Sequence, residues 1–146
     1  RLLRYADILL MYAEVENALG KDEQARIALN EVRSRVELPE ITSSGTELRD
    51  AIRKERRLEL ALESNRLYDL RRWKTDDGKP YICSIMGPNG SFVKYNQTST
   101  DQYEVANQKE SSDKGITFNE TRDLLFPIPI SEITMSNNTI VQNPGY

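Results

Sequence analysis

Apolar side chains recur every three or four positions through the first half of the chain, a spacing that restricts this half to helices packed on one another. The first segment with this spacing is residues 2–19. Its charged residues outside the apolar positions are expected to face water, and they are Arg4, Asp7 and Glu14. A helix with two adjoining apolar faces packs against more than one neighbour. The two stripes of this segment are Leu2, Ala6, Leu9 and Ala13, and Tyr5, Ile8, Tyr12, Val15 and Leu19.

The same spacing predicts further helices before residue 75. Gly20 is expected to end the first helix and Asp22 to cap the second. The second helix continues through Val36 and stops at Pro39, and a third runs over residues 46–62. After a break, the pattern resumes in a short fourth helix at Leu67, Leu70 and Trp73.

The first two predicted helices resemble a tetratricopeptide unit. They are joined by a short turn that contains glycine, and they carry Ala13 and Ala25 at positions where small side chains let paired helices approach closely. Repeats of this kind bury their apolar faces by stacking on neighbours, and about three units are needed for stability. We therefore expect the chain to be a fragment of a longer protein.

Residues 75–146 have a different composition, with five of the six prolines, five of the seven glycines and seven of the ten asparagines. Residues 81–86 and 91–95 flank an Asn-Gly step and predict a β-hairpin. Residues 96–123 are polar and predict a long loop, and residues 124–130 must be extended because two prolines interrupt them. The predicted fold is mainly α: tetratricopeptide-like helical repeats over residues 1–74, followed by an irregular, loop-rich region with a small hairpin.

Composition excludes several kinds of chemistry within these 146 residues. There is no histidine, which removes Ser-His-Asp and Cys-His catalysis and histidine-metal sites, and the single cysteine, Cys83, allows no internal disulfide. The residues indicate no cofactor and no metal site. The net charge of −3 gives no basic surface for nucleic acid, and no apolar run approaches the roughly 18 residues of a membrane-spanning helix.

Three stretches together resemble the SusD/RagB family of outer-membrane nutrient-binding lipoproteins. The first is RYADILLMYAE at residues 4–14, and the second is IRKERRLELALE at 52–63, which continues to Trp73. The third comprises FPIP at 126–129 and the terminal QNPGY. Their order and spacing resemble the C-terminal portion of that family, and the resemblance covers nearly all of residues 1–146.

The resemblance has consequences for function that composition and periodicity do not give. It implies a lipid-anchored protein on the surface of a Gram-negative outer membrane, with the anchor outside these residues. It implies non-catalytic binding of oligosaccharide and a SusC-like, TonB-dependent transporter as the partner that receives the glycan. An alternative is a tetratricopeptide-like interaction scaffold whose helices hold a peptide and bind no sugar.

A row of glutamates on the third predicted helix has two interpretations. Two nearby carboxylates could act as acid and base on a glycosidic bond, which would make the protein a glycosidase. However, Glu55 and Glu59 share a helix stripe with Leu48, Ile52 and Leu62, and arginines lie close enough to pair with them. Charges on a buried face persist only when they are paired. We therefore predict a structural ion-pair network of Glu55, Arg56, Glu59, Glu63 and Arg66.

Aromatic residues in the loop-rich half are the candidate ligand contacts. Sugar binding needs aromatic faces for the C–H side of a pyranose ring, and loops on a rigid scaffold are where binding residues tend to lie. We predict ligand contacts at Tyr81, Tyr95 and Tyr103, with the alternative that these rings only cover the scaffold. Trp73 follows two arginines and could stack on a ligand, but its helical spacing favours a core position.

Overall fold

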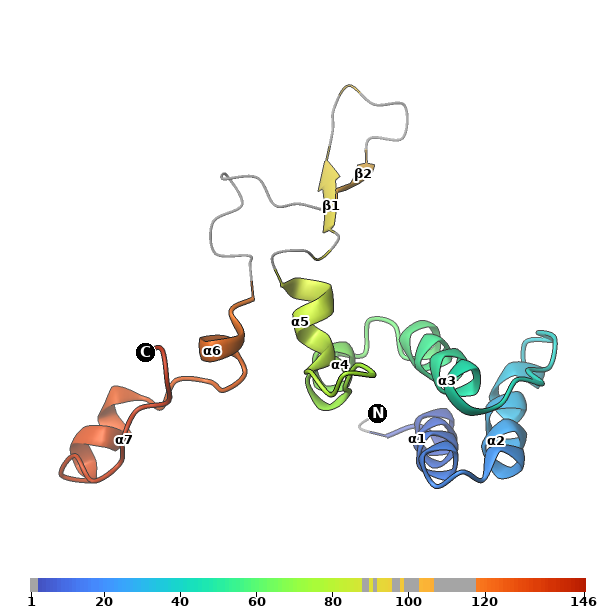
Figure 1. Ribbon diagram of the computed structural model, residues 1–146, viewed down its shortest axis with the longest axis horizontal. Coiled ribbons are helices and arrows are strands. Elements are labelled where there is room, and N and C mark those ends of the chain that lie inside the picture. Colours follow the sequence, from blue (N-terminus) through green and yellow to red (C-terminus); the bar gives the residue numbers. More distant parts are fainter. Residues whose placement is uncertain (1–2, 88–89, 91, 96–97, 99–102, 107–117) are drawn as a thin grey trace. The chain divides into compact units, whose positions relative to one another are not determined.

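The structure is a computed structural model that describes residues 3–87, 90, 92–95, 98, 103–106 and 118–146. Figure 1 shows the order of the elements along the chain, and the fold is mainly α, as the sequence predicts. The chain divides into two compact units, residues 1–67 and 68–146, which are described separately. Among the described residues, no helix combines the length and apolar character that crossing a membrane requires.

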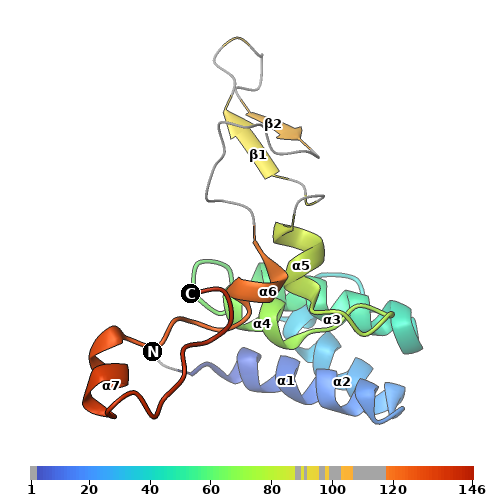
Figure 2. The ribbon, with the colours of Figure 1, turned by 60° about the vertical axis from the view of Figure 1, so that its left-hand side comes forward.

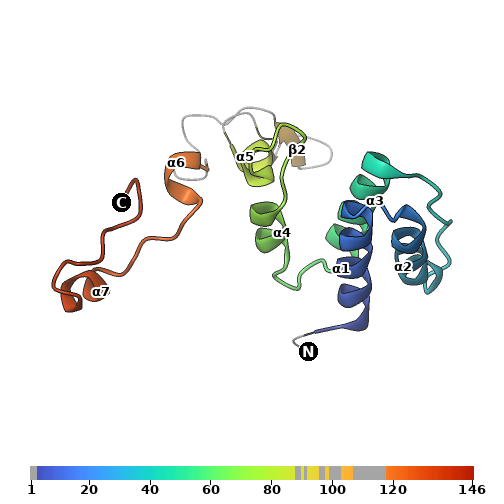
Figure 3. The ribbon, with the colours of Figure 1, turned by 60° about the horizontal axis from the view of Figure 1, so that its bottom comes forward.

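The first unit consists mainly of α1 (Tyr5–Ala18), α2 (Asp22–Ser34) and α3 (Gly45–Glu59), which pack pairwise against one another (Figure 3). Gly20 lies in the turn between α1 and α2 with a φ of +75°, a conformation that glycine adopts without a steric penalty. The prediction that Asp22 caps α2 is wrong, because Asp22 is the first helical residue. Its carboxylate instead accepts hydrogen bonds from the Gly45 backbone N–H (2.7 Å), where α3 begins, and from the Asn17 side-chain amide (2.8 Å).

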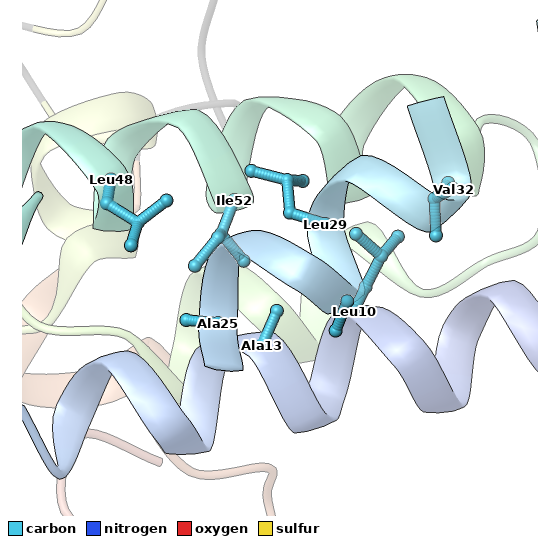
Figure 4. Packing of buried hydrophobic residues seen from close by; sticks show 8 residues of the cluster. Leu10, Ala13, Ala25, Leu29, Val32, Leu48 and Ile52 are labelled. Atoms are coloured by element: carbon cyan, nitrogen blue, oxygen red, sulfur yellow. The ribbon is translucent and has the colours of Figure 1, made fainter. Parts of the chain in front are cut away.

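The core of this unit lies between the three helices (Figure 4). Ala13 of α1 and Ala25 of α2 are both fully buried, which agrees with the small residues expected where paired helices approach closely. Larger side chains fill the space on either side of these alanines. The buried cluster comprises Leu10, Ala13, Ala25, Ala28, Leu29, Val32, Leu48 and Ile52.

Two expectations about helix faces in this unit are wrong. Leu62 was placed on the buried stripe of the third helix, but α3 ends at Glu59 and Leu62 is fully exposed. Beyond the end of α3, Leu62 and Ser64 adopt left-handed conformations, with φ of +66° and +63°, so the helical period does not continue. On α1, Asp7 and Glu14 were expected to face water, but both lie against Arg56 of α3.

The second unit contains most of α4 (Arg66–Arg72), then α5 (Tyr81–Met86), β1 (Phe92–Tyr95), β2 (Tyr103–Ala106), α6 (Glu120–Asp123) and α7 (Ile130–Met135). Residues 81–86 were predicted to be a strand, and this is wrong. They form α5, which buries Ile82 against Leu70 and Phe118. Pro80 fixes a φ of −57° just before the helix, and tertiary packing overrides the strand preference of the apolar residues.

The small β-hairpin therefore lies one segment later than predicted. β1 occupies most of the predicted second strand, and its partner β2 lies inside residues 96–123, which were predicted to be a loop. α6 also falls in this predicted loop. The predicted turn at residues 87–90 includes Pro88 and Asn89, which lie outside the described residues.

The C-terminal segment folds back on the extended stretch that carries the two prolines. The Gln142 side-chain amide both donates to the Ile128 carbonyl and accepts from the Ile128 N–H, each at 2.8 Å. The Asn143 amide donates to the Phe126 carbonyl at 2.6 Å. Arg71 of α4 donates to two backbone carbonyls at the end of α6. Side chains thus satisfy backbone groups that have no strand partner.

Candidate functional site

The two-stranded ribbon carries an exposed apolar face. The strands β1 and β2 lie side by side (Figure 2). They pair antiparallel, with Val93 opposite Val105 and Tyr95 opposite Tyr103. Directly opposed residues point to the same side of a ribbon, and so do residues two positions apart on one strand. The four side chains therefore share one face. All four are exposed, Tyr95 by 56% and Tyr103 by 63%.

Tyr95 and Tyr103 form the aromatic part of this face. Their ring centroids are 5.6 Å apart, and the ring planes meet at 64°, an edge-to-face pair. Such pairs hold each ring in a preferred orientation. A tyrosine offers an apolar ring with a polar hydroxyl at its tip, which suits a sugar that has C–H groups on one face and hydroxyls around its edge. The structure thus brings together two of the three predicted ligand contacts.

Tyr81, the third predicted contact, has a different environment. It is the first residue of α5 and is half-buried against the cluster of Leu70, Ile82 and Phe118. Its ring forms a T-shaped pair with Trp73, with centroids 6.0 Å apart. Trp73 is only 3% exposed, so it lies in the core, as its helical spacing favoured. A ligand role for Tyr81 stays a prediction.

The predicted glutamates lie among arginines from other helices. Glu55 is buried, and its carboxylate is 2.6 Å from the Arg33 guanidinium of α2. Glu59 accepts from Arg4 at 2.8 Å and from Arg35 at 2.7 Å. Pairing across helices satisfies these carboxylates and ties α3 to α2 and to the residue before α1.

The other predicted members extend the same pattern. Arg56 is buried and donates to Asp7 of α1 at 2.9 Å, and Glu14 lies 4.0 Å away. Glu63 is 2.7 Å from Arg4. Arg66 begins α4 and is half-buried. Sequence reasoning missed Arg4, Arg33 and Arg35 as partners because it considered only arginines close to the glutamates along the chain.

The electrostatics of Glu59 do not suit a general acid. Burial raises the pKa of the Glu59 carboxyl, but hydrogen bonds from Arg4 and Arg35 outweigh burial and hold that pKa below its ordinary value. A general acid needs a raised pKa so that it carries a proton near neutral pH. Glu59 is therefore arranged to stay ionised and paired. Among the described residues, no group of histidine, cysteine, aspartate and glutamate side chains could hold a metal ion.

The lowered pKa of Glu59 makes the stability of the first unit depend on pH. In the unfolded chain Glu59 regains its ordinary pKa of about 4.3, so the unfolded state takes up the proton first as pH falls. The stabilisation from Glu59 is complete above that value and is lost as pH falls through the lower folded pKa. Urea unfolding between pH 7 and about 3.5 should therefore show a smaller acid loss for Glu59→Gln than for the wild type. Equal acid losses would contradict this account.

Comparison with known proteins decides the family. The model of the SusD family matches residues 1–146, the whole of the chain. The chain belongs to the SusD family. SusD-like protein P2 of Formosa agariphila is 30% identical over 99% of this chain, and SusD-like protein P38 of the same organism is 44% identical over 60% of it.

A solved structure supports the same assignment. The crystal structure of a SusD-like protein from Bacteroides fragilis superposes on 99% of this chain with a TM-score of 0.73 and 38% sequence identity. The chain covers 25% of that structure and 25% of protein P2. It thus spans about a quarter of the length of these SusD-like relatives.

Proposed function

We propose that residues 1–146 are the C-terminal part of a SusD-like lipoprotein that binds oligosaccharide at the outer-membrane surface and delivers it to a SusC-like, TonB-dependent transporter. The family match over the whole chain supports this proposal, as does the sequence resemblance to the C-terminal portion of the family. The greater length of the relatives is consistent with an N-terminal part that carries the lipid anchor.

The exposed Tyr95–Tyr103 pair is the observation that supports a sugar contact in this part of the protein. The two aromatic rings lie beside Val93 and Val105, and all four side chains are exposed on one face of the ribbon. Binding sites commonly combine such surface with a few polar groups. The polar residues next to these tyrosines in the sequence, Asn96, Gln97, Asp101 and Gln102, lie outside the described residues.

Binding is proposed to occur without cleavage. Hydrolysis of a glycoside needs two carboxyl groups that converge on the bond, one of them with a raised pKa. Glu55 and Glu59 are instead paired with arginines from other helices, and the pKa of Glu59 is lowered. The pair is consistent with a structural role.

Calorimetry of the full-length protein against a panel of oligosaccharides tests this function. We expect at least one glycan to bind and to be recovered unchanged when each mixture is analysed for products. Release of shorter sugars by the pure protein would contradict binding without cleavage and would show that the protein is a catalyst. No binding to any glycan, together with co-purification of a peptide partner, would favour the second candidate.

That second candidate is a peptide-binding scaffold, and one feature favours it. A groove of about 510 Å³ lies beside the start of α1, lined by Leu3, Arg4, Tyr5, Ala6, Leu9, Glu31, Val32 and Arg35. Its mixed apolar and charged lining could accept a peptide segment. The glycan proposal predicts that substitutions in this groove leave sugar affinity unchanged, whereas the scaffold proposal predicts that they abolish peptide binding.

A further inference from the structure

Residues 142–146, the strap, are hydrogen-bonded to residues 122–128, the docking segment. Gln142 makes the central contact, because its side-chain amide accepts from the Ile128 N–H and donates to the Ile128 carbonyl, each at 2.8 Å. Ile128 lies between two prolines, which have no N–H, so it carries the one backbone donor of this Pro-Ile-Pro sequence. Only an amide side chain satisfies both groups, since an ionised carboxylate cannot donate and an apolar side chain does neither.

Two more side chains of the strap contact the main chain of the docking segment. The Asn143 amide donates to the Phe126 carbonyl at 2.6 Å, and the Tyr146 hydroxyl donates to the Leu125 carbonyl at 3.3 Å. In all three cases the strap supplies a side chain and the docking segment supplies backbone groups. Recognition therefore depends mainly on the sequence of the strap.

Gly145 lies where a side chain would collide with the docking segment. Its φ is +91°, a conformation that glycine adopts without a steric penalty. A Cβ atom at this position would lie 2.8 Å from the Cβ and Cγ atoms of Arg122 and 3.2 Å from its Cα atom. Non-bonded carbon atoms prefer separations of about 3.5–4.0 Å, so the docking segment accepts glycine at this point of the strap and disfavours alanine.

The docking segment has supports in which the strap takes no part. Arg71 of α4 donates to the Asp123 carbonyl at 2.7 Å and to the Leu124 carbonyl at 2.8 Å, and its guanidinium lies 4.4 Å from the centroid of the Phe126 ring. The Asp123 carboxylate accepts from the Asn119 N–H at 2.7 Å. These contacts hold the docking segment in place when the strap is detached, and a site that is already formed favours binding of a separate peptide.

The strap is attached as a surface peptide would be. No residue in 119–146 is buried, and Val141, just before the strap, is 82% exposed. Segments held by exposed hydrogen bonds open more readily than segments held by a core. We propose that the docking segment is a peptide-binding site for the sequence Gln-Asn-x-Gly-Tyr, which the strap occupies in cis and which a separate peptide of that sequence can occupy instead. Neither glycan nor transporter takes part in this exchange.

Fluorescence anisotropy tests the proposal on the full-length protein from which residues 142–146 have been removed. The probe is a fluorescently labelled peptide with the sequence of residues 139–146. We expect the probe to bind the shortened protein. The wild-type protein should bind it at least about tenfold more weakly, because a competing segment in cis has a high effective concentration. Equal binding to the two proteins would overturn the proposal, since the peptide would then contact another surface.

Single changes in the probe test its specificity. Gln142→Leu removes two hydrogen bonds and Gly145→Ala adds the collision with Arg122, so each should raise Kd about tenfold or more. Val141→Ala is the matched control, because an exposed side chain contributes little, and its Kd should stay within about twofold of the unchanged probe. Equal affinity of the Gly145→Ala probe and the unchanged probe would contradict the proposed site.

A second measurement avoids the deletion. In the full-length protein Gly145→Ala should weaken the strap, so that hydrogen exchange at the Ile128 amide becomes about tenfold faster or more and the unchanged probe gains access. Val141→Ala in the same protein should alter neither result. Unchanged exchange at Ile128 in the Gly145→Ala protein, or no binding of the probe to either altered protein, would overturn the proposal. Both results are independent of whether the protein binds glycan.

Discussion

Arg56→Ala is expected to lower the free energy of unfolding of the first unit by about 3–5 kcal/mol, as loss of one partner of a buried ion pair does. The Arg56 side chain is 5% exposed and donates to Asp7 at 2.9 Å, with Glu14 at 4.0 Å. Alanine would leave both carboxylates of α1 without this cation on a face that packs against α3. The loss should appear in urea unfolding followed by circular dichroism.

The neighbouring residue supplies the control for this experiment. Arg57 lies next to Arg56 on α3 but is exposed, so Arg57→Ala should change stability by no more than about 0.5 kcal/mol. Adding Asp7→Asn to Arg56→Ala should cost less than the sum of the two single changes, because the Asp7 carboxylate is then no longer left without its cation. If Arg56→Ala unfolds at the same urea concentration as Arg57→Ala, the ion pair between α1 and α3 contributes no stability.

Leu29→Ala is expected to destabilise the same unit by about 2–5 kcal/mol. Leu29 is fully buried in the cluster between α1, α2 and α3 (Figure 4), and truncation leaves a cavity that rigid helices fill only in part. Ile27 lies two residues away on the same helix and is 63% exposed, so Ile27→Ala is a control of the same chemical type. Thermal and urea unfolding should separate the two variants clearly. If both variants lose similar amounts of stability, the side of α2 that carries Leu29 is not the side that faces the core.

The helices of the first half could be predicted because their apolar spacing is set locally. The spacing gave α1, α2 and α3 and the alanines at their contact, since each helix must turn one stripe inward. It could not say which of the two stripes of α1 faces the rest of this unit. In the structure Asp7 and Glu14 lie against Arg56 of α3, a contact between helices distant in the sequence, and Tyr12 is exposed.

The second half was harder to predict because its elements are short. Residues 81–86 have the composition of a strand, yet six residues can take either structure, and the cluster around Ile82 selects the helix α5. The hairpin was predicted with the wrong partner for β1, since pairing depends on where the chain returns rather than on the nearest turn signal.

The contacts within the candidate site also depend on residues that are distant in the sequence. Tyr95 and Tyr103 could be chosen from residue type alone, but their pairing across the ribbon depends on the register of β1 and β2. The arginines that hold Glu55 and Glu59 come from segments 22 or more positions away, and spacing along one helix carries no signal for them.

We propose that this part of a SusD-like protein contacts sugar through the Tyr95–Tyr103 pair. The direct test is calorimetry of the full-length protein, carrying Tyr95→Ala and Tyr103→Ala together, with an oligosaccharide that the wild type binds. Tyr68→Ala is the control, because Tyr68 is an exposed tyrosine on α4, away from the ribbon in sequence. The account predicts an increase in Kd of about tenfold or more for the double variant, the loss that truncating aromatic anchors produces, and none for the control. Equal affinity in the double variant and the control would contradict it and place the sugar contacts elsewhere in the protein.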